Sequence, residues 1–170
     1  ARLDIPAIIC NGGPMLGGVV FDGRESDNSS TVEALGMLQT GQITEAEYQA
    51  LEDGCCPCNG SCSFLGTANT MCAVAEALVP AVLAERFRYA QASGRRIVEM
   101  VREELTARKI ITRESLSNAL RLGMAIGGST NMALHFPAIA YESECDFTMD
   151  EIDEIARSTP HLALIYPNGP

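Results

Sequence analysis

The stretch GCCPCNGSCSFLGTANTM, residues 54–71, holds four of the seven cysteines of this chain and leads into a segment of helical composition, TANTMCAVAEAL (67–78). The glycines and small polar residues before Thr67 predict a loop, and the alanine-rich run after it predicts a helix. The first N–H groups of a helix have no partner inside it and carry partial positive charge, so they favour a nearby thiolate or other anion. We therefore expect the loop to present Cys62 beside a helix N-terminus.

Capping signals predict that most of the chain around this stretch is helical. A Ser, Thr or Asp side chain at the first position accepts a backbone N–H that the helix leaves free, and a Glu three residues later completes a capping box. The signals are, in chain order, Ser29 or Ser30, Thr44 with Glu47, Thr112, and Thr148 with Glu151. Gly54 is expected to end the helix before the cysteines, because glycine is the common residue after a helix.

Two further glycine signals divide the second half of the chain. Gly94 is expected to end a helix that begins near Pro80 and to separate it from another over residues 95–109. The Gly127-Gly128 pair is expected to break the helix that follows residue 112, so that a new helix begins after it.

Two short apolar runs predict strands. IPAIIC (5–10) ends in an Asn-Gly-Gly turn signal, and LALIYP (162–167) is a second candidate. Continuous apolar runs of this length fit strands buried on both faces, as in parallel sheets. The expected fold class is therefore α/β, with a short parallel-type sheet flanked by several helices. GGPM (12–15) suits close backbone approach to a ligand at the end of the first strand.

The composition of the chain limits the kinds of partner that we expect it to bind. The chain has 170 residues, 46% of them hydrophobic, and a net charge of −10. A nucleic-acid interface needs clustered Lys and Arg, so no nucleic-acid partner is expected. No run of about 20 apolar residues occurs, so no membrane span is expected. The chain starts ARLDIPAIIC, with neither Met nor a secretory signal, which favours an interior segment of a cytoplasmic protein with reduced thiols.

The clustered cysteines do not have the spacing of the common thiol sites. Cys56, Cys58 and Cys62 form C-x-C and C-x3-C, whereas structural zinc sites use C-x2-C pairs or pairs of histidines. A thioredoxin-like redox pair also needs C-x2-C. Iron–sulfur clusters accept thiolates from distant segments, so that chemistry stays open for one or two of these residues.

The other single candidates are interpreted as core residues. Cys10, Cys72 and Cys145 are expected to be buried free thiols, since cysteine is among the most buried residue types. His135 lies in the apolar run MALHFPAIA and is interpreted as a packed histidine and not as a catalytic one.

GGSTN (127–131) allows two interpretations that the sequence leaves open. A glycine pair followed by Ser129, Thr130 and Asn131 at the start of a helix can bind a carboxylate or phosphate on free N–H groups. The same residues can equally be ordinary N-caps after a helix break.

Three stretches together resemble a known family. ARLDIPAIICNGGPMLGG (1–18), GSCSFLGTANTMCAVAEAL (60–78) and AIGGSTNMALHFPAIA (125–140) are similar, in this order, to the IlvD/Edd dehydratases. That family includes dihydroxy-acid dehydratase, 6-phosphogluconate dehydratase and the arabinonate and xylonate dehydratases. The resemblance covers nearly the whole chain.

The resemblance implies that residues 1–170 are part of a larger N-terminal α/β domain. In the family, a Cys-Asp-Lys motif for the cluster and the magnesium site precedes the segment matching Ala1, and a C-terminal domain follows. Relatives also have a loop between the residues matching Leu78 and Val79, which is missing from this sequence. By resemblance, Cys62 matches a cluster cysteine and Cys56 a common cysteine without a ligand role.

The implied activity is that of a hydro-lyase. The resemblance implies an iron–sulfur cluster, [2Fe–2S] or [4Fe–4S], and Mg²⁺ acting on a 2,3-dihydroxy acid of branched-chain amino-acid biosynthesis, in a homodimer. A sugar-acid dehydratase of the same family is the alternative, and a non-catalytic α/β module stabilised by zinc or thiols is an alternative of another class. Cys55 and Cys58 have no counterpart, and this piece alone is expected to be inactive.

Overall fold

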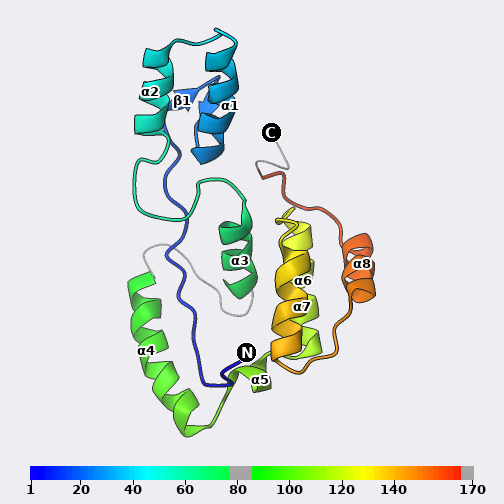
Figure 1. The fold of residues 1–170 in the computed structure, drawn as a ribbon. Coiled ribbons are helices and arrows are strands. Elements are labelled where there is room, and N and C mark those ends of the chain that lie inside the picture. The colour runs from blue at the N-terminus through cyan, green and yellow to red at the C-terminus, as the bar shows by residue number, and fades with distance from the viewer. Residues whose placement is uncertain (77–85, 166–170) are drawn as a thin grey trace.

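The computed structural model describes residues 1–76 and 86–165 of the chain (Figure 1). The helices are α1 (Asn28–Gln39), α2 (Glu45–Gly54), α3 (Thr67–Glu76), α4 (Arg86–Arg102), α5 (Ala107–Ile110), α6 (Arg113–Ala125), α7 (Met132–Glu142) and α8 (Met149–Ser158). The strands β1 (Val20–Phe21) and β2 (Arg24–Glu25) pair with each other in a hairpin.

The α/β class fits this structure, but the expectation of a parallel-type sheet was wrong, because β1 and β2 are antiparallel. Asp22 and Gly23 join the strands with φ of 47° and 78°, the positive values that two-residue hairpin turns require. Such a short connection can join only antiparallel neighbours, since parallel ones need a crossover of a dozen or more residues. Parallel pairing in the described residues amounts to an isolated bridge between Pro14 and Ser61.

The first apolar run is extended but belongs to no strand of the described structure. Ile5 and Ile9 are 53% and 71% exposed. Residues 7–9 instead line an apolar groove of about 490 Å³ together with Met100 of α4 and Ile110 of α5. The run was expected to be buried on both faces by a sheet, and the described residues provide no neighbouring strand for it.

The second apolar run is irregular where it is described. The N–H groups of Leu162 and Ala163 donate to one carbonyl, that of Ala125, at 2.7 and 3.2 Å. This contact holds the segment against the end of α6 instead of placing it in a sheet. Tyr166 and Pro167 lie outside the described residues.

The main core lies between α3, α6, α7 and α8. Leu120 of α6 and Phe136 of α7 are 0% and 1% exposed, and Val74 of α3 and Ile155 of α8 belong to the same buried cluster. Helix α6 contacts α3, α7 and α8. As a result, the loop that enters α3 and the turn that joins α6 to α7 lie at the same end of this helical body (Figure 1).

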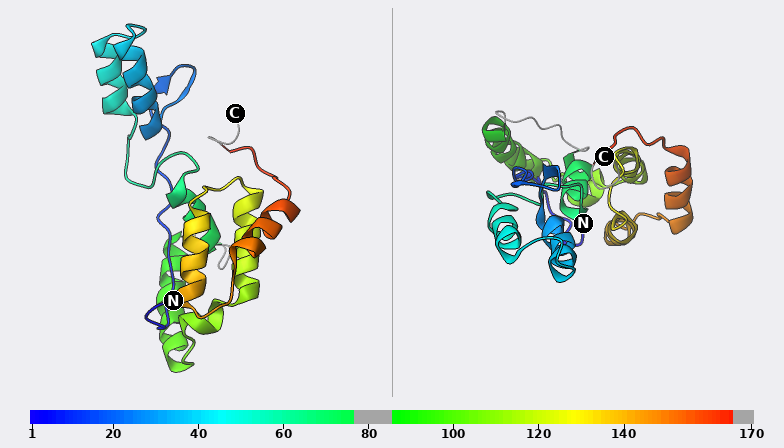
Figure 2. Two further views of the ribbon diagram at one scale, coloured as in Figure 1. Left: turned by 45° about the vertical axis from the view of Figure 1, so that its right-hand side comes forward. Right: turned by 90° about the horizontal axis from the view of Figure 1, so that it is seen from above.

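A second, smaller unit projects from the helical body. It consists of β1, β2, α1 and α2, and we call these residues 19–55 the α1–α2 arm (Figures 1 and 2). Ala34, Leu51 and Cys55 are its buried hydrophobic residues, with Phe21 and Ile43 packed against them. The arm therefore has its own small core, separate from that of the helical body.

The capping boxes at Thr44 and Thr148 and the cap at Thr112 are confirmed. Each of these hydroxyls accepts the backbone N–H of the residue three positions later. Helix α1 begins earlier than expected, because Asp27 and not Ser29 or Ser30 is its N-cap. A carboxylate accepts more strongly than a hydroxyl, and Asp27 Oδ1 accepts the Ser29 N–H at 2.6 Å.

Gly54 ends α2 as expected, but Gly94 lies inside α4 and does not end a helix. A glycine ends a helix readily when it adopts positive φ, as Gly41 does after α1 with φ of 71°. Gly94 is not among the residues with positive φ, and inside a helix it costs only about 1 kcal/mol relative to Ala. The expected helix start at Pro80 and the expected missing loop between Leu78 and Val79 lie outside the described residues.

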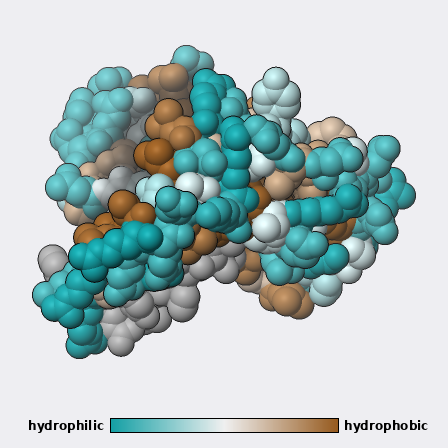
Figure 3. Space-filling view, turned by 90° about the horizontal axis from the view of Figure 1, so that it is seen from below, coloured by the Kyte–Doolittle hydropathy of each residue, from teal (hydrophilic) through white to brown (hydrophobic). Residues whose placement is uncertain are grey.

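The surface is mixed in character. Figure 3 views the molecule from below and shows apolar residues in patches between hydrophilic ones. Among the described residues, no helix is both long enough and apolar enough to span a membrane.

Candidate functional site

The loop that carries Cys62 is paired with the N-terminal segment. The Met15 N–H donates to the Ser61 carbonyl at 2.8 Å, and the Ser61 N–H donates to the Gly13 carbonyl at 3.1 Å. Gly60 has a φ of +150°, and a Cβ there would lie 2.4 Å from the Met15 nitrogen. The GGPM segment was expected to approach a ligand closely, and in the structure its backbone approaches this loop.

Asn69, in the first turn of α3, holds the same loop from the other side. Its Nδ2 donates to the carbonyls of Cys62 and Phe64 at 2.6 and 2.7 Å. Its Oδ1 accepts the Ser61 hydroxyl at 2.6 Å. The half-buried Cys62 therefore lies in a loop whose backbone is fixed on both of its sides.

The GGSTN turn is fastened to the same helix turn. The Ser129 N–H donates to the Thr70 hydroxyl at 2.9 Å, and Thr70 is fully buried. A Cβ on Gly128 would lie 2.7 Å from Thr70 Cγ2 and 2.9 Å from the Gly123 carbonyl oxygen. The glycine at position 128 is what lets the turn approach α3 and α6 this closely.

The side chains of the turn reach across to α3 as well. Asn131 Nδ2 donates to the Thr67 hydroxyl at 2.6 Å and to the Ser129 hydroxyl at 3.2 Å. Asn131 is the N-cap residue of α7, but its side chain makes no capping hydrogen bond. Thr130 is exposed. Of the three expected binding residues, Ser129 and Asn131 are thus bonded to α3, whereas Thr130 is open to solvent.

A pocket of about 380 Å³ lies where the start of α3 meets the turn. Residues 64–67 line one side and residues 128–130 line the other. The backbone N–H groups in the first turn of a helix lack partners inside it, so the start of α3 presents donors here. No acidic residue is among the lining residues that the structure describes. Hydroxyls and helix N–H groups without nearby carboxylates suit a small anion.

The remaining cysteines of the 55–62 loop lie in different environments. Burial raises the pKa of the Cys55 thiol, as does the neighbouring Cys56 thiol, and Cys55 belongs to the core of the α1–α2 arm. Cys58 Sγ accepts the Leu16 N–H at 3.3 Å. Cys56 is exposed. Cys55 and Cys58 therefore have structural contacts in the fold.

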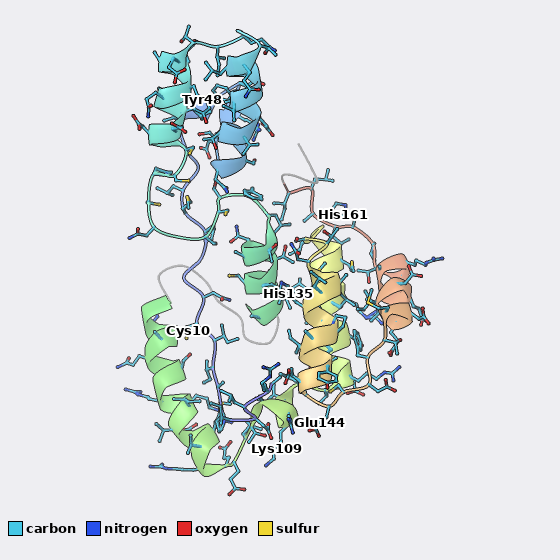
Figure 4. The ribbon with its side chains drawn as sticks, viewed as in Figure 1. Cys10, Tyr48, Lys109, His135, Glu144 and His161 are labelled. Atoms are coloured by element: carbon cyan, nitrogen blue, oxygen red, sulfur yellow. The ribbon has the colours of Figure 1, made fainter. Side chains whose placement is uncertain are left out.

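The expectation of a buried thiol was wrong for Cys10, which is exposed, whereas Cys72 and Cys145 are half-buried. Cys10 is the last residue of the extended run that lacks a sheet, which is why it is not covered. His135 is half-buried on α7, and its N–H donates to the Asn131 carbonyl at 3.0 Å. Figure 4 shows Cys10, His135 and His161 apart from one another.

The described residues offer few ligands for the metals that the resemblance implies. Nowhere in residues 1–76 and 86–165 do three His, Cys, Asp or Glu side chains gather to hold a metal ion. A half-buried thiol on a fixed loop suits one corner of an iron–sulfur cluster, since thiolates from separate segments can share a cluster. Cys62 fits that role as a single ligand, whereas the carboxylates of the described residues form no cluster of three or more that could hold Mg²⁺.

Comparison with known proteins identifies the family. The family model of the dihydroxy-acid/6-phosphogluconate dehydratase N-terminal region matches residues 1–170. The chain belongs to this dehydratase family. The resemblance drawn from the three sequence stretches is thereby confirmed.

Relatives within the dehydratase family are similar along the whole chain. Dihydroxy-acid dehydratase of Caldanaerobacter subterraneus subsp. tengcongensis is 46% identical over 99% of this chain and 32% of the relative. Dihydroxy-acid dehydratases of Methanosarcina barkeri and Methanothrix thermoacetophila are each 47% identical over 99% of this chain and 32% and 31% of their own length. The chain thus spans about a third of the length of these relatives.

The parts of this candidate site were named from the sequence, but the residues that join them were missed. Thr67, Asn69 and Thr70 were placed in a predicted helix after a loop, but no functional role was predicted for them. Their signal was the run of polar residues in the first turn of TANTMCAVAEAL, a helix that is otherwise mostly apolar. Polar side chains at the start of a helix have free backbone groups and neighbouring loops within reach.

Proposed function

We propose that the full-length protein is an iron–sulfur hydro-lyase that removes water from a 2,3-dihydroxy acid to give a 2-keto acid. The observation that carries the proposal is the first turn of α3, which fixes two segments far apart in sequence. Asn69 holds the Cys62 loop, and Thr67 and Thr70 hold the turn at residues 128–131. A cluster ligand and an anion-binding pocket are thereby built on one helix end.

Cys62 is the residue of this chain that would hold the cluster, as a thiolate. When bound, such a cluster supplies an iron that acts as a Lewis acid toward a substrate hydroxyl. The contribution of the chain is to fix the backbone of Cys62 before the cluster arrives. The loop is held by Asn69 on one side and by the pairing with Gly13 and Met15 on the other.

Ser129, Thr130 and Asn131 are proposed to bind the anionic end of the substrate. Asn131 Nδ2 donates to both the Ser129 and the Thr67 hydroxyl, and these two hydroxyls lie 3.4 Å apart, so that one of them donates to the other. The hydroxyl that accepts in this pair keeps its own hydrogen free to turn toward a carboxylate in the pocket. Thr130 lines the same pocket. A carboxylate at this position would also face the free N–H groups at the start of α3.

The substrate class follows the relatives. Those at 46–47% identity are named dihydroxy-acid dehydratase, which supports the enzyme of branched-chain amino-acid biosynthesis over a sugar-acid dehydratase. The proposal includes Mg²⁺, whose ligands would lie outside the described residues, together with a homodimer and a cytoplasmic location. Residues 1–170 would be part of the N-terminal domain, and the other cluster ligands would also come from outside them.

The test is iron and acid-labile sulfide analysis of the full-length protein purified without oxygen, beside Cys62→Ser. The variant is expected to lose most of both, and wild type to dehydrate dihydroxy acids. Cys10→Ser is the control, since Cys10 is an exposed thiol of the same chain that matches no ligand, and it should keep both. Zinc or no metal in wild type would overturn the proposal and favour a thiol-stabilised module.

A further inference from the structure

We propose that Asn69 is the positioning residue that fixes Cys62 for cluster binding, an inference that rests on the proposed function. Its side chain bonds the residue before Cys62, Cys62 itself, and the residue two positions after it. These partners are the Ser61 hydroxyl at 2.6 Å, the Cys62 carbonyl at 2.6 Å and the Phe64 carbonyl at 2.7 Å. All the polar atoms of the amide are thereby used on one short segment.

The chemistry of the partners fixes the orientation of this amide. Backbone carbonyls can only accept hydrogen bonds, so the end of Asn69 that faces Cys62 and Phe64 must be the NH₂ group. Its two hydrogens match the two carbonyls, and a hydroxyl, which can donate, faces Oδ1. A residue without two donors on one atom cannot make this set of contacts.

The role of Asn69 in the loop can be separated from its place in helix α3. The side chain makes no bond to the first N–H groups of α3 and reaches back into the preceding loop instead. Asn69→Asp keeps the size of the side chain and adds negative charge in the first turn, which stabilises a helix. The same change leaves two carbonyls facing a carboxylate that has no hydrogen to donate.

The experiment uses the full-length protein purified without oxygen, as wild type, Asn69→Asp and Cys62→Ser. Asn118→Asp is the matched control, because Asn118 is exposed on α6. On exposure to air, Asn69→Asp is expected to lose its visible cluster absorption at least about tenfold faster than wild type, as the loss of two part-buried hydrogen bonds predicts. Its cluster spectrum should shift. Its melting temperature should fall only slightly below that of wild type, because the added charge in the first turn of α3 offsets part of that loss.

The outcomes separate this inference from the proposed function. If Cys62→Ser loses iron but Asn69→Asp keeps the wild-type spectrum and rate of cluster loss, the positioning role of Asn69 is wrong. If Cys62→Ser keeps iron and sulfide, the proposed ligand itself is wrong. If Asn69→Asp does not fold, Ser61→Ala decides: it removes the anchor of Oδ1 and should speed cluster loss severalfold, and a wild-type rate would overturn the inference.

Discussion

The helical body and the α1–α2 arm differ in how much of their structure rests on buried side chains. The body has a continuous apolar cluster from four helices, including the fully buried Leu120 and Phe136. The arm has a much smaller cluster around Leu51, and its hairpin and helices are fixed largely by turns and caps. The candidate site is built on α3, α6 and α7, so it belongs to the part with the larger core.

The rigidity of each unit depends on the size of its buried core. Cavities in a packed core are costly, because the neighbours relax only partly around them. Changes in the body should therefore reach the site, whereas changes in the arm should stay local. Substitutions in the full-length protein can test this difference, from the largest expected effect to the smallest.

Phe136→Ala should have the largest effect. Phe136 is 1% exposed in α7, and removing a buried Phe side chain costs about 3–5 kcal/mol. We expect a lower midpoint of urea unfolding and faster hydrogen exchange in α3, α6 and α7 together. A loss below about 1 kcal/mol would contradict a single core that links these helices.

Leu51→Ala should damage the arm and spare the body. Leu51 is 1% exposed, so the substitution costs about 2–5 kcal/mol, but its cluster lies entirely within the α1–α2 arm. Hydrogen exchange should become faster in residues 28–54 and stay unchanged in α6. Equal acceleration in both units would show that arm and body unfold as one.

Thr148→Ala and Thr44→Ala compare the same capping box in the two units. Each substitution removes a hydroxyl that accepts a helix N–H, at a cost of about 1 kcal/mol. Thr148→Ala should lower the main unfolding midpoint slightly. Thr44→Ala should appear only as faster exchange in α2, and a shift of the main midpoint by it would argue against an independent arm.

The smallest effect is a difference in acid sensitivity. The Thr148 N–H lowers the pKa of Glu151, and Arg113 lowers it further, whereas the pKa of Glu47 is lowered by Thr44 alone. A lowered folded pKa means that the stabilisation is present above the ordinary value of 4.5 and is lost as pH falls through the folded value.

Glu151→Gln should therefore flatten the acid limb of the body's unfolding profile below about pH 4.5 more than Glu47→Gln does. Near neutral pH, the urea midpoints of Glu151→Gln and Glu47→Gln should run parallel, separated by a constant offset. The measurement is the urea midpoint as a function of pH. A larger acid effect of Glu47→Gln would show that the ion pair of Glu151 with Arg113 adds nothing.

Local signals in the sequence were sufficient for much of the fold. The N-caps at Thr44, Thr112 and Thr148 were predicted correctly, because a cap and its hydrogen-bond partner lie within four residues of each other. The prediction of a strand over residues 5–10 was wrong. A strand forms only beside a neighbouring strand, and the sequence does not show which segment would be that neighbour. The prediction that Gly94 ends a helix was wrong, because a glycine permits a helix to end without requiring it.

The sequence by itself determined the caps at Thr44, Thr112 and Thr148, the Cys62 loop, the GGSTN turn and the family to which the chain belongs. Only the tertiary structure decided that Asn69, Thr67 and Thr70, on a single turn of α3, bind both the loop and the turn. The physical reason is that a cap depends on neighbours in the chain, whereas these bonds join Thr70 to Ser129 and Thr67 to Asn131. Such pairs meet only after α3, α6 and α7 have packed into one core.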